Sequence, residues 1–392
     1  MFASLFSRRK ALAALAAMAG AMALAACEPV PGAVGAGPGI APGAPVRVAL
    51  LVPAGSGSPS DELIATHLEN AARLAVADLD GGAIELQVYA TGGDPARAAQ
   101  VAARAVSDGA AIILGPLYAE EANAAGVAVA SSGVNLLAFS NNPTIAGGNV
   151  FVLGQTFRNT ADRLVRYGLR HGVNNYLVAH GQDLQGQIGR DSIIAAVRGN
   201  GGTVAGTESY PLSQAGVVAA APRIAAAARA AGAGAIFTTA GVNAELPILA
   251  TALPEAGLDP SVTRFIGLTR WNATPQALSL PGLQGGLFAL PDQQMTALFE
   301  SRYSAAYGTP PHPLASLAYD GIAAVGALVA RGDTQALGRR ALTQAQGFQG
   351  TSGIFRLLPD GTNERGLAVA EVRGGQITIV DRAPRAFGGA GS

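Results

Sequence analysis

The sequence predicts an α/β protein made of two lobes, each a doubly wound parallel sheet. Short apolar runs rich in β-branched residues alternate with Ala-rich stretches whose apolar residues recur at helical spacing. The alternation runs from residue 46 to about residue 150 and starts again near residue 155. Because such alternation favours right-handed βαβ crossovers, each half is expected to form its own parallel sheet. Two similar halves imply two lobes that face each other across a cleft.

The first half contains four predicted strands with helices between them. The first strand is continuously apolar after Arg47, as expected of a strand buried in a parallel sheet. Asp94 followed by Pro95 predicts the start of a helix, because Asp caps helix amino termini and Pro suits the first turn. The predicted strands cover residues 46–53, 84–90, 110–114 and 134–139, and the first helix covers about 61–78.

The second half repeats the same alternation of helices and strands. A later helix, predicted over 314–329, contains Asp320, for which we expect a hinge or helix-face role. Within the repeat itself, helices are predicted over 160–172, around 191–198, over 216–231 and over 243–253, and strands over 175–179, 203–208, 235–239 and 264–268.

Candidate ligand-binding residues follow from the strand ends. In open α/β sheets the ligand binds beyond the carboxyl ends of the strands, so the segments directly after the strands are expected to line the interlobe cleft. These segments are rich in Gly, Ser, Asn and Thr. The candidates are Gly115, Pro116, Leu117, Ser140, Asn141, Gln182, Thr239, Ala240, Thr269, Arg270 and Trp271.

The charges among these candidates favour some ligands over others. A receptor for free amino acids needs donors for the carboxylate and an acid for the ammonium, because buried charge is tolerated only when it is paired. Ser140 and the amides near Leu117 supply donors, but no acid stands at the strand ends of the second half, where Arg270 adds positive charge. The amino-acid interpretation is weakened, and an anionic ligand, a glycan-like ligand or no ligand stay open.

Two residues near these loops each have two interpretations. Trp271, the single tryptophan, either stacks on a sugar or peptide or packs into the core of the second lobe. His180 follows a strand, where it either contacts a ligand or, as we expect, faces solvent from a loop.

Composition excludes several kinds of chemistry. Lys10 is the single lysine and lies in the export signal described below, so the mature chain can form no Schiff base and has no P-loop lysine. Cys27 is the single cysteine, and the four histidines are not at metal-ligand spacing. No nucleophile-elbow or dinucleotide-binding motif stands at the expected turns. We therefore expect a binding protein that is not an enzyme and uses no cofactor or metal.

The amino terminus has the three parts of an export signal. A basic region at 8–10 precedes an apolar run at 11–23, which is too short to span a membrane, and residues 24–27 read Leu-Ala-Ala-Cys. This ending resembles the bacterial lipobox, which implies a lipoprotein whose lipid is attached to Cys27. The paired Arg8 and Arg9 also resemble a twin-arginine signal, although Ala11 replaces its usual Phe, so both export routes stay open.

These features predict the organisation of the chain. Loss of residues 1–26 removes three of the 26 basic residues and no acidic one, so the mature net charge is about −3 without a basic block, which argues against a nucleic-acid partner. The predicted parts are a signal peptide (1–26), a flexible tether (27–45), a two-lobed body and a disordered tail (386–392).

Short motifs over residues 46–383 resemble the type I periplasmic binding proteins, such as the branched-chain amino-acid binding proteins of transport systems. The segments V-A-L-L-V-P at 48–53 and I-L-G-P at 113–116 are similar to the first and third strands of that family. S-N-N-P at 140–143 stands where the family often has a Ser/Thr-rich ligand loop, and 348–361 resembles its glycine-containing C-terminal segment. The resemblance implies two lobes joined by a multi-strand hinge, with a first lobe at 46–154 and about 292–333 and a second lobe at 155–291 and about 334–385.

The lipobox points to one branch of this family, the penicillin-binding protein activator lipoproteins, which bind peptidoglycan synthases. The opening strand and I-L-G-P-L at 113–117 are similar to that branch, although no helical-repeat domain precedes the binding fold. The resemblance implies an envelope lipoprotein that activates a penicillin-binding protein. The alternative is the substrate-binding lipoprotein of an ABC transporter for amino acids or another small polar ligand. Glu28 is not the Asp that retains lipoproteins in the inner membrane, which favours the outer membrane.

Overall fold

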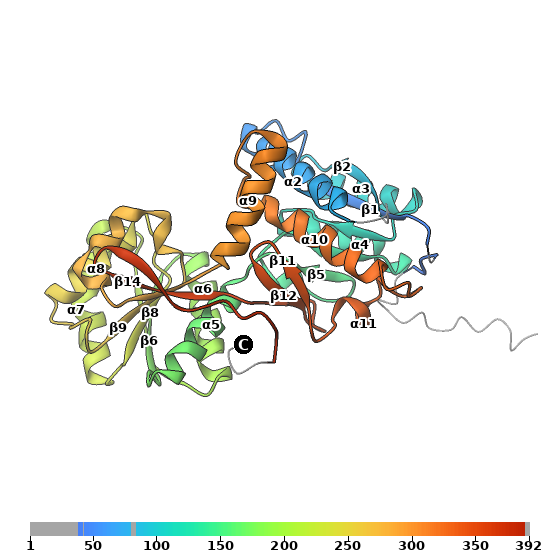
Figure 1. Cartoon of the computed structure of the whole chain (residues 1–392). Helices are drawn as coiled ribbons and strands as arrows, with labels where there is room; N and C mark the ends of the chain where they lie inside the picture. Colours follow the sequence, from blue (N-terminus) through green and yellow to red (C-terminus); the bar gives the residue numbers. More distant parts are fainter. Residues whose placement is uncertain (1–37, 42, 80–83, 389–392) are drawn as a thin grey trace, which may run out of the picture.

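The computed structural model describes residues 38–41, 43–79 and 84–388, which form two α/β lobes lying side by side (Figure 1). The signal peptide, Cys27 and most of the expected tether lie outside the described residues. The chain passes between the lobes three times, near residues 153–156, 291–292 and 366–367. This arrangement confirms the predicted fold class.

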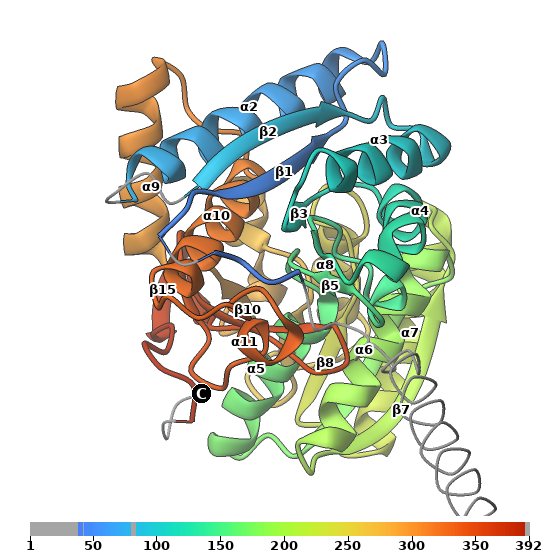
Figure 2. The same ribbon diagram turned by 90° about the vertical axis from the view of Figure 1, so that its right-hand side faces the viewer.

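The first lobe is built on a parallel sheet with the strand order β2-β1-β3-β4-β5. Alternate residues of β1 pack on opposite faces: Leu50 lies in the core beneath α2 and α10, and Leu51 lies in the core beneath α3 and α4 (Figure 2). The elements are β1 (Val46–Val52), α2 (Pro59–Ala77), β2 (Ile84–Ala90), α3 (Pro95–Ser107), β3 (Ile112–Leu114), α4 (Ala119–Val129), β4 (Asn135–Ala138) and β5 (Val150–Val152).

The second lobe repeats this order in a sheet of seven strands, β15-β14-β10-β9-β8-β6-β7. Five of them are parallel, while β14 runs antiparallel to β10 and to β15. The helices α5 and α6 cover one face, and α7 and α8 cover the other. The elements are α5 (Phe157–Arg170), β6 (Asn175–Gly181), α6 (Leu184–Gly199), β7 (Thr203–Tyr210), α7 (Gln214–Ala230), β8 (Ala235–Thr238), α8 (Glu245–Glu255), β9 (Arg264–Gly267), β10 (Leu287–Leu290), β14 (Ala368–Arg373) and β15 (Gln376–Asp381).

The C-terminal third returns to the first lobe for longer than the sequence predicts. Phe348, Phe355 and Leu357 are buried in the same core as α2 and α10, so the boundary expected near residue 334 lies instead near residue 366. Phe387 was expected in the disordered tail, but the centre of its ring lies 4.6 Å from the guanidinium carbon of Arg356. The returning elements are α9 (Gln293–Tyr307), α10 (Ala315–Val329), α11 (Arg339–Leu342), β11 (Phe348–Gly350), β12 (Gly353–Leu357) and β13 (Asn363–Arg365).

Helix starts show where local chemistry decides the structure. Helix α3 begins where Asp94 and Pro95 predict, and the Asp94 carboxylate accepts a hydrogen bond from the amide of Arg97 at 2.7 Å. Helix α5 begins three residues before the predicted start, because Thr156 and Asn159 form a reciprocal capping box. Among the described residues, no helix is both long and apolar enough to cross a membrane.

The Asp94 cap gives a first prediction. Asp94→Ala removes the acceptor for the Arg97 amide and is expected to lower the free energy of unfolding by about 1 kcal/mol. Asp94→Ser keeps an oxygen at the cap and should recover most of that loss. Urea unfolding of the three proteins is the measurement, and equal midpoints for the Ala and Ser variants would contradict the capping role.

Candidate functional site

A cleft of about 550 Å³ lies between the lobes, beyond the carboxyl ends of the strands. Its position matches the rule for open α/β sheets, because loops that follow strands of both lobes line it, such as the loops with Leu117 after β3 and Arg270 after β9. Much of the wall is apolar and comes from the first lobe, while the polar groups come from loops and from the hinge. The apolar residues include Ile64, Leu117, Phe139, Leu314 and Leu317, and the polar ones include Asn141, Gln155, Arg270, Ser352 and Arg365.

The two charged residues of this lining are both arginines. Arg270 follows β9 in the second lobe, its side chain is exposed, and its guanidinium makes no hydrogen bond or ion pair with any described residue. Arg365 ends β13 at the hinge and is 6 % exposed. No Asp or Glu is present among the described residues that line the cleft. The cleft therefore has a positive electrostatic character.

Arg365 is held in place by the hinge and the first lobe. Its guanidinium donates to the carbonyl oxygen of Leu153, lies 3.4 Å from the Ser352 hydroxyl, and forms an ion pair of 3.5 Å with Asp320 on α10. Asp320 is completely buried and also accepts hydrogen bonds from the amide and hydroxyl of Thr351, at 2.7 and 2.9 Å. Burial raises the pKa of the Asp320 carboxyl, and the Arg365 charge and the Thr351 hydrogen bonds act in the opposite direction.

The structure places three of the predicted ligand-binding residues, Leu117, Asn141 and Arg270, in the cleft lining. Thr239 and Thr269 line a separate pocket of about 150 Å³ within the second lobe. The side chain of Gln182 is exposed and donates to the Ser209 hydroxyl at 3.2 Å, outside the cleft lining.

Other candidates have structural roles in the loops. Gly115 has a φ of +83°, and a Cβ there would collide with the carbonyl oxygen of Leu51, so the chain requires glycine at this turn. Pro116 is buried beside it and does not line the cleft. Ser140 is 5 % exposed, and its hydroxyl accepts a hydrogen bond from the amide of Asn142 instead of facing the cleft lining.

Trp271 does not line the cleft. Its side chain is fully buried in the core of the second lobe, where it packs against Phe288 with a ring separation of 5.5 Å. Ala240 is buried in the same core. The sequence interpretation of Trp271 as a core residue is therefore the one that the structure supports, because the short helical turn after β9 directs the ring inward.

His180 was expected to face solvent from a loop, and this expectation is wrong. Strand β6 extends two residues beyond the predicted end, so His180 lies within the strand and is 7 % exposed. Its Nδ1 lies 2.8 Å from the carbonyl oxygen of Gly181. Among the described residues, no group of three or more His, Cys, Asp or Glu side chains is placed to hold a metal ion.

Sequence reasoning missed the hinge residues of the cleft, above all Arg365 and Ser352. Both lie in the segment 348–361 or just after it, which had a family resemblance but no predicted place in the cleft. A buried arginine beside a hinge leaves no local pattern in a sequence. Only the return of the chain to the first lobe brings Arg365 beside Leu153.

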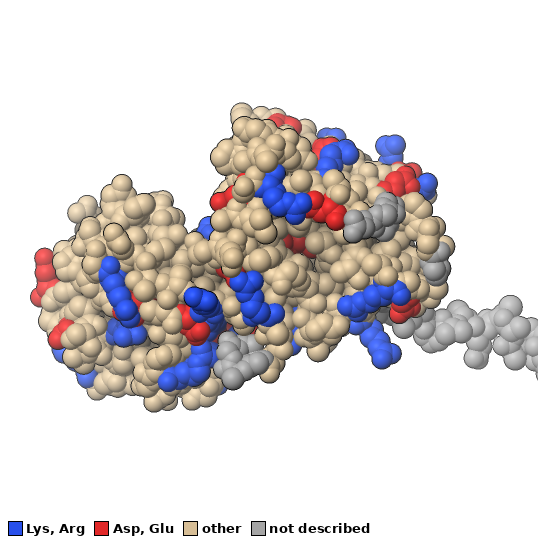
Figure 3. Space-filling model, viewed as in Figure 1, with Lys and Arg blue, Asp and Glu red and all other residues tan. Residues whose placement is uncertain are grey.

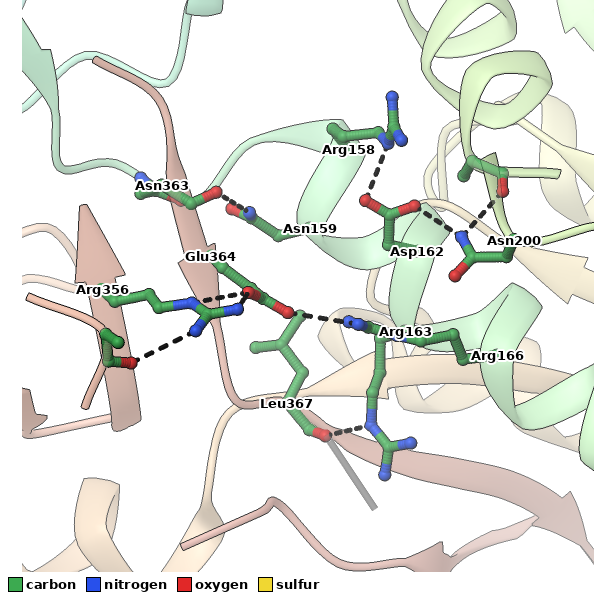
Figure 4. A network of polar contacts seen from close by, with 12 residues as sticks. Arg158, Asn159, Asp162, Arg163, Arg166, Asn200, Arg356, Asn363, Glu364 and Leu367 are labelled. Carbon is green, nitrogen blue, oxygen red and sulfur yellow. Dashed lines mark hydrogen bonds and ion pairs between the residues drawn. The ribbon is translucent and has the colours of Figure 1, made fainter. Parts of the chain in front are cut away.

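A second depression, of about 620 Å³, lies beside the hinge between α5, α6 and the β12–β13 turn. Its charged side chains already have partners: Arg158 pairs with Asp162 at 2.7 Å, and Glu364 pairs with Arg166 at 3.1 Å and with Arg356 at 2.6 Å (Figure 4). Although this depression is larger than the cleft, we assign the ligand site to the cleft, because only there does a charged side chain lack a partner.

The same network ties the second lobe to the hinge. The side-chain Nδ2 of Asn159 donates to the backbone carbonyl of Asn363 at 2.8 Å, and Arg163, almost fully buried, donates through Nε to the Leu367 carbonyl (Figure 4). Asn363 in turn donates to the carbonyl oxygens of Val152 and Gly154. The crossings near 153–156 and 366–367 are thus linked to α5 and to each other by buried hydrogen bonds.

Comparison with known proteins agrees with this architecture. Residues 45–376 match the family model described as periplasmic binding protein. No curated protein is matched by the chain. Among solved structures, an ABC transporter protein from Rhodospirillum rubrum is similar with a TM-score of 0.71 at 18% identity, covering 86% of this chain and 100% of that one.

Two similar structures contain ligands. A Desulfitobacterium hafniense ABC transporter substrate-binding protein in complex with Leu has a TM-score of 0.59 at 17% identity, covering 86% of this chain and 100% of that one. A solute-binding protein of an ABC transporter from Rhodopseudomonas palustris, in complex with 3,4-dihydroxybenzoic acid, has a TM-score of 0.54 at 17% identity, covering 86% of this chain and 96% of that one. At these identities the similarity shows the fold.

Proposed function

Because the chain belongs to the periplasmic binding protein family, we propose that it is a receptor whose interlobe cleft binds a small solute for an uptake transporter. The observation that carries the proposal is the cleft itself. Its volume of about 550 Å³ lies within the range of small-molecule sites, and it combines apolar walls with a few convergent polar groups, as such sites do.

The position of the cleft supports binding coupled to movement of the lobes. Arg270 comes from the second lobe, Leu117 and Leu317 come from the first, and Arg365 stands at the hinge between them. A solute that contacts both lobes gains contacts when the lobes close, so it favours the closed state. The similar proteins with bound Leu and 3,4-dihydroxybenzoic acid are consistent with this role.

Family membership implies a place in the periplasm or cell envelope. We further propose that Cys27 carries a lipid that anchors the chain. A transporter partner would require the inner membrane, whereas Glu28 after the cysteine favours the outer membrane. Fractionation of the two membranes therefore separates the transporter role from the role as penicillin-binding protein activator, which the comparisons do not support.

A solute screen with the lipidated, detergent-solubilised protein tests the proposal. We expect at least one small solute to raise the midpoint of thermal unfolding, because it binds only the folded state. Leu117→Trp fills the cleft wall and should abolish that rise, while Leu184→Trp, at a residue 73 % exposed on the second lobe, should not. Small-angle X-ray scattering should show a more compact protein with the solute.

A pull-down from solubilised envelope distinguishes the receptor role from synthase activation. Recovery of a transporter permease would support the receptor role. Recovery of a bifunctional penicillin-binding protein, together with no response to any solute in the screen, would replace the receptor role by synthase activation.

A further inference from the structure

We infer that the solute is an organic carboxylate without an ammonium group, held by Arg270 and Arg365 with its apolar body against the first lobe. This inference rests on the proposed receptor function and names the chemical class of its ligand. The juxtaposition that carries it is two guanidinium groups, one exposed and one buried, on a cleft lining that has no acidic side chain among its described residues.

The charge of Arg270 is available to a ligand. No described residue forms an ion pair or hydrogen bond with its guanidinium, which is exposed at the cleft. When the lobes close around a solute, this group loses water and needs an anion, because a buried charge without a partner is costly. A carboxylate suits it, since the planar guanidinium binds carboxylates through two parallel hydrogen bonds.

Arg365 supplies a second, fixed positive group at the hinge end of the cleft. The Leu153 carbonyl, the Ser352 hydroxyl and Asp320 hold its guanidinium, which also lies 5.2 Å from the centre of the Phe355 ring. Because the Arg365 side chain is already ordered, ligand binding costs little additional conformational entropy of the protein. Its one ion pair, with Asp320, is long at 3.5 Å.

The acidic groups near the cleft have other partners or are out of reach. Asp320 stands behind Arg365, and Asp292 caps α9 by accepting from the amides of Gln294 and Met295. Asp61 accepts a hydrogen bond from the Tyr118 hydroxyl, which raises the pKa of Tyr118 to about 12. Glu121 is completely buried and does not line the cleft.

This arrangement disfavours an amino acid. An α-ammonium group that enters the closed cleft would lose water next to two guanidinium groups, with no lining carboxylate to balance it. The apolar part of the lining suits a hydrocarbon or aromatic body, because it includes Leu117, Phe139 and Leu317. Removing the ammonium group from an amino acid while keeping its carbon skeleton should therefore improve binding.

Two matched sets of probes test the inference by calorimetry on the full protein. The first set is isocaproate, its neutral amide, and leucine, which is isocaproate with an α-amino group. The second is hydrocinnamate, its amide, and phenylalanine. We expect at least one carboxylate to bind at least about tenfold more tightly than its amide and its amino acid, and its affinity to fall as salt increases, because charge pairing is screened.

The variants locate the effect. Arg270→Gln should weaken carboxylate binding by about 10- to 100-fold, the range expected for a charged hydrogen bond. Arg198→Gln removes an exposed arginine of α6 that lies outside the cleft lining and should leave the affinity unchanged. Thermal unfolding of both variants checks that the fold is retained.

Two outcomes would overturn different claims. If an amino acid or an amide binds as tightly as the matched carboxylate, or if carboxylates fail while other solutes raise the unfolding midpoint, the ligand class is wrong and the receptor function stands. If no solute of any class binds in either experiment, the receptor function itself is wrong.

Discussion

Replacing Asp320 with asparagine is expected to lower the free energy of unfolding by about 3–5 kcal/mol, the usual cost of leaving one member of a buried ion pair without its partner. The substitution keeps the shape of the side chain and an oxygen for the Thr351 amide, but it removes the charge that faces Arg365. Both side chains are buried, so water cannot replace the lost charge. Urea unfolding followed by circular dichroism measures the change.

Two further variants define this result. Asp333→Asn changes an exposed carboxylate in a turn and is expected to shift stability by no more than about 0.5 kcal/mol. The double variant Asp320→Asn with Arg365→Met removes both charges and should be more stable than Asp320→Asn alone, because no unpaired charge is left. A loss below about 1 kcal/mol for Asp320→Asn would show that Arg365 does not depend on this partner.

The second large effect is expected at Trp271. Trp271→Ala should destabilise the protein by about 3–5 kcal/mol, because it leaves a large cavity beside Phe288 in the core of the second lobe. Val262→Ala, at a residue 73 % exposed in the same lobe, is the control and should have little effect. Chemical unfolding measures both variants.

Fluorescence gives an independent check on Trp271. Because Trp271 is the single tryptophan, it is the only source of indole fluorescence, and a buried indole emits at shorter wavelength than an exposed one. Emission at the wavelength of a solvated indole in the native protein would contradict its burial. A loss of ligand affinity in Trp271→Ala with unchanged stability would instead restore the stacking interpretation that the structure disfavours.

On the face shown in Figure 3, basic and acidic side chains are scattered among neutral ones over both lobes, without a large area of one sign. Many arginines outside the cleft pair with nearby acids, such as Arg356 with Glu364 and Arg163 with Asp381. Arg270 forms no such pair with a described residue and lines the cleft.

The stability predictions and the ligand inference concern the same structural unit. Asp320 pairs with Arg365, and Arg365 lies at both the cleft and the hinge. A change at Asp320 is therefore expected to alter ligand binding as well as stability, whereas Arg270→Gln should alter binding alone. Comparison of Asp320→Asn with Arg270→Gln therefore distinguishes the contribution of Arg365 to ligand binding from that of Arg270.

Local patterns determined the elements and the fold class. Continuous apolar runs predicted buried strands such as β1, helical spacing predicted α2, and Asp94 with Pro95 predicted the start of α3. These predictions succeeded because each depends on interactions within a few residues. Strand length alone does not explain which strands were missed, because β3 with three residues was predicted, whereas β14 and β15 with six residues each were not.

The sequence by itself also determined what the chain lacks for chemistry: a lysine after Lys10, a second cysteine and spaced metal ligands. It located the strand ends, and hence Leu117, Asn141 and Arg270, because in a parallel sheet all strands end on one edge. Only the tertiary structure decided that Trp271 points into the core and that Arg365, whose Asp320 partner is 45 residues away, completes the cleft. Burial and ion pairing between distant segments depend on how the lobes pack, and no local pattern encodes that.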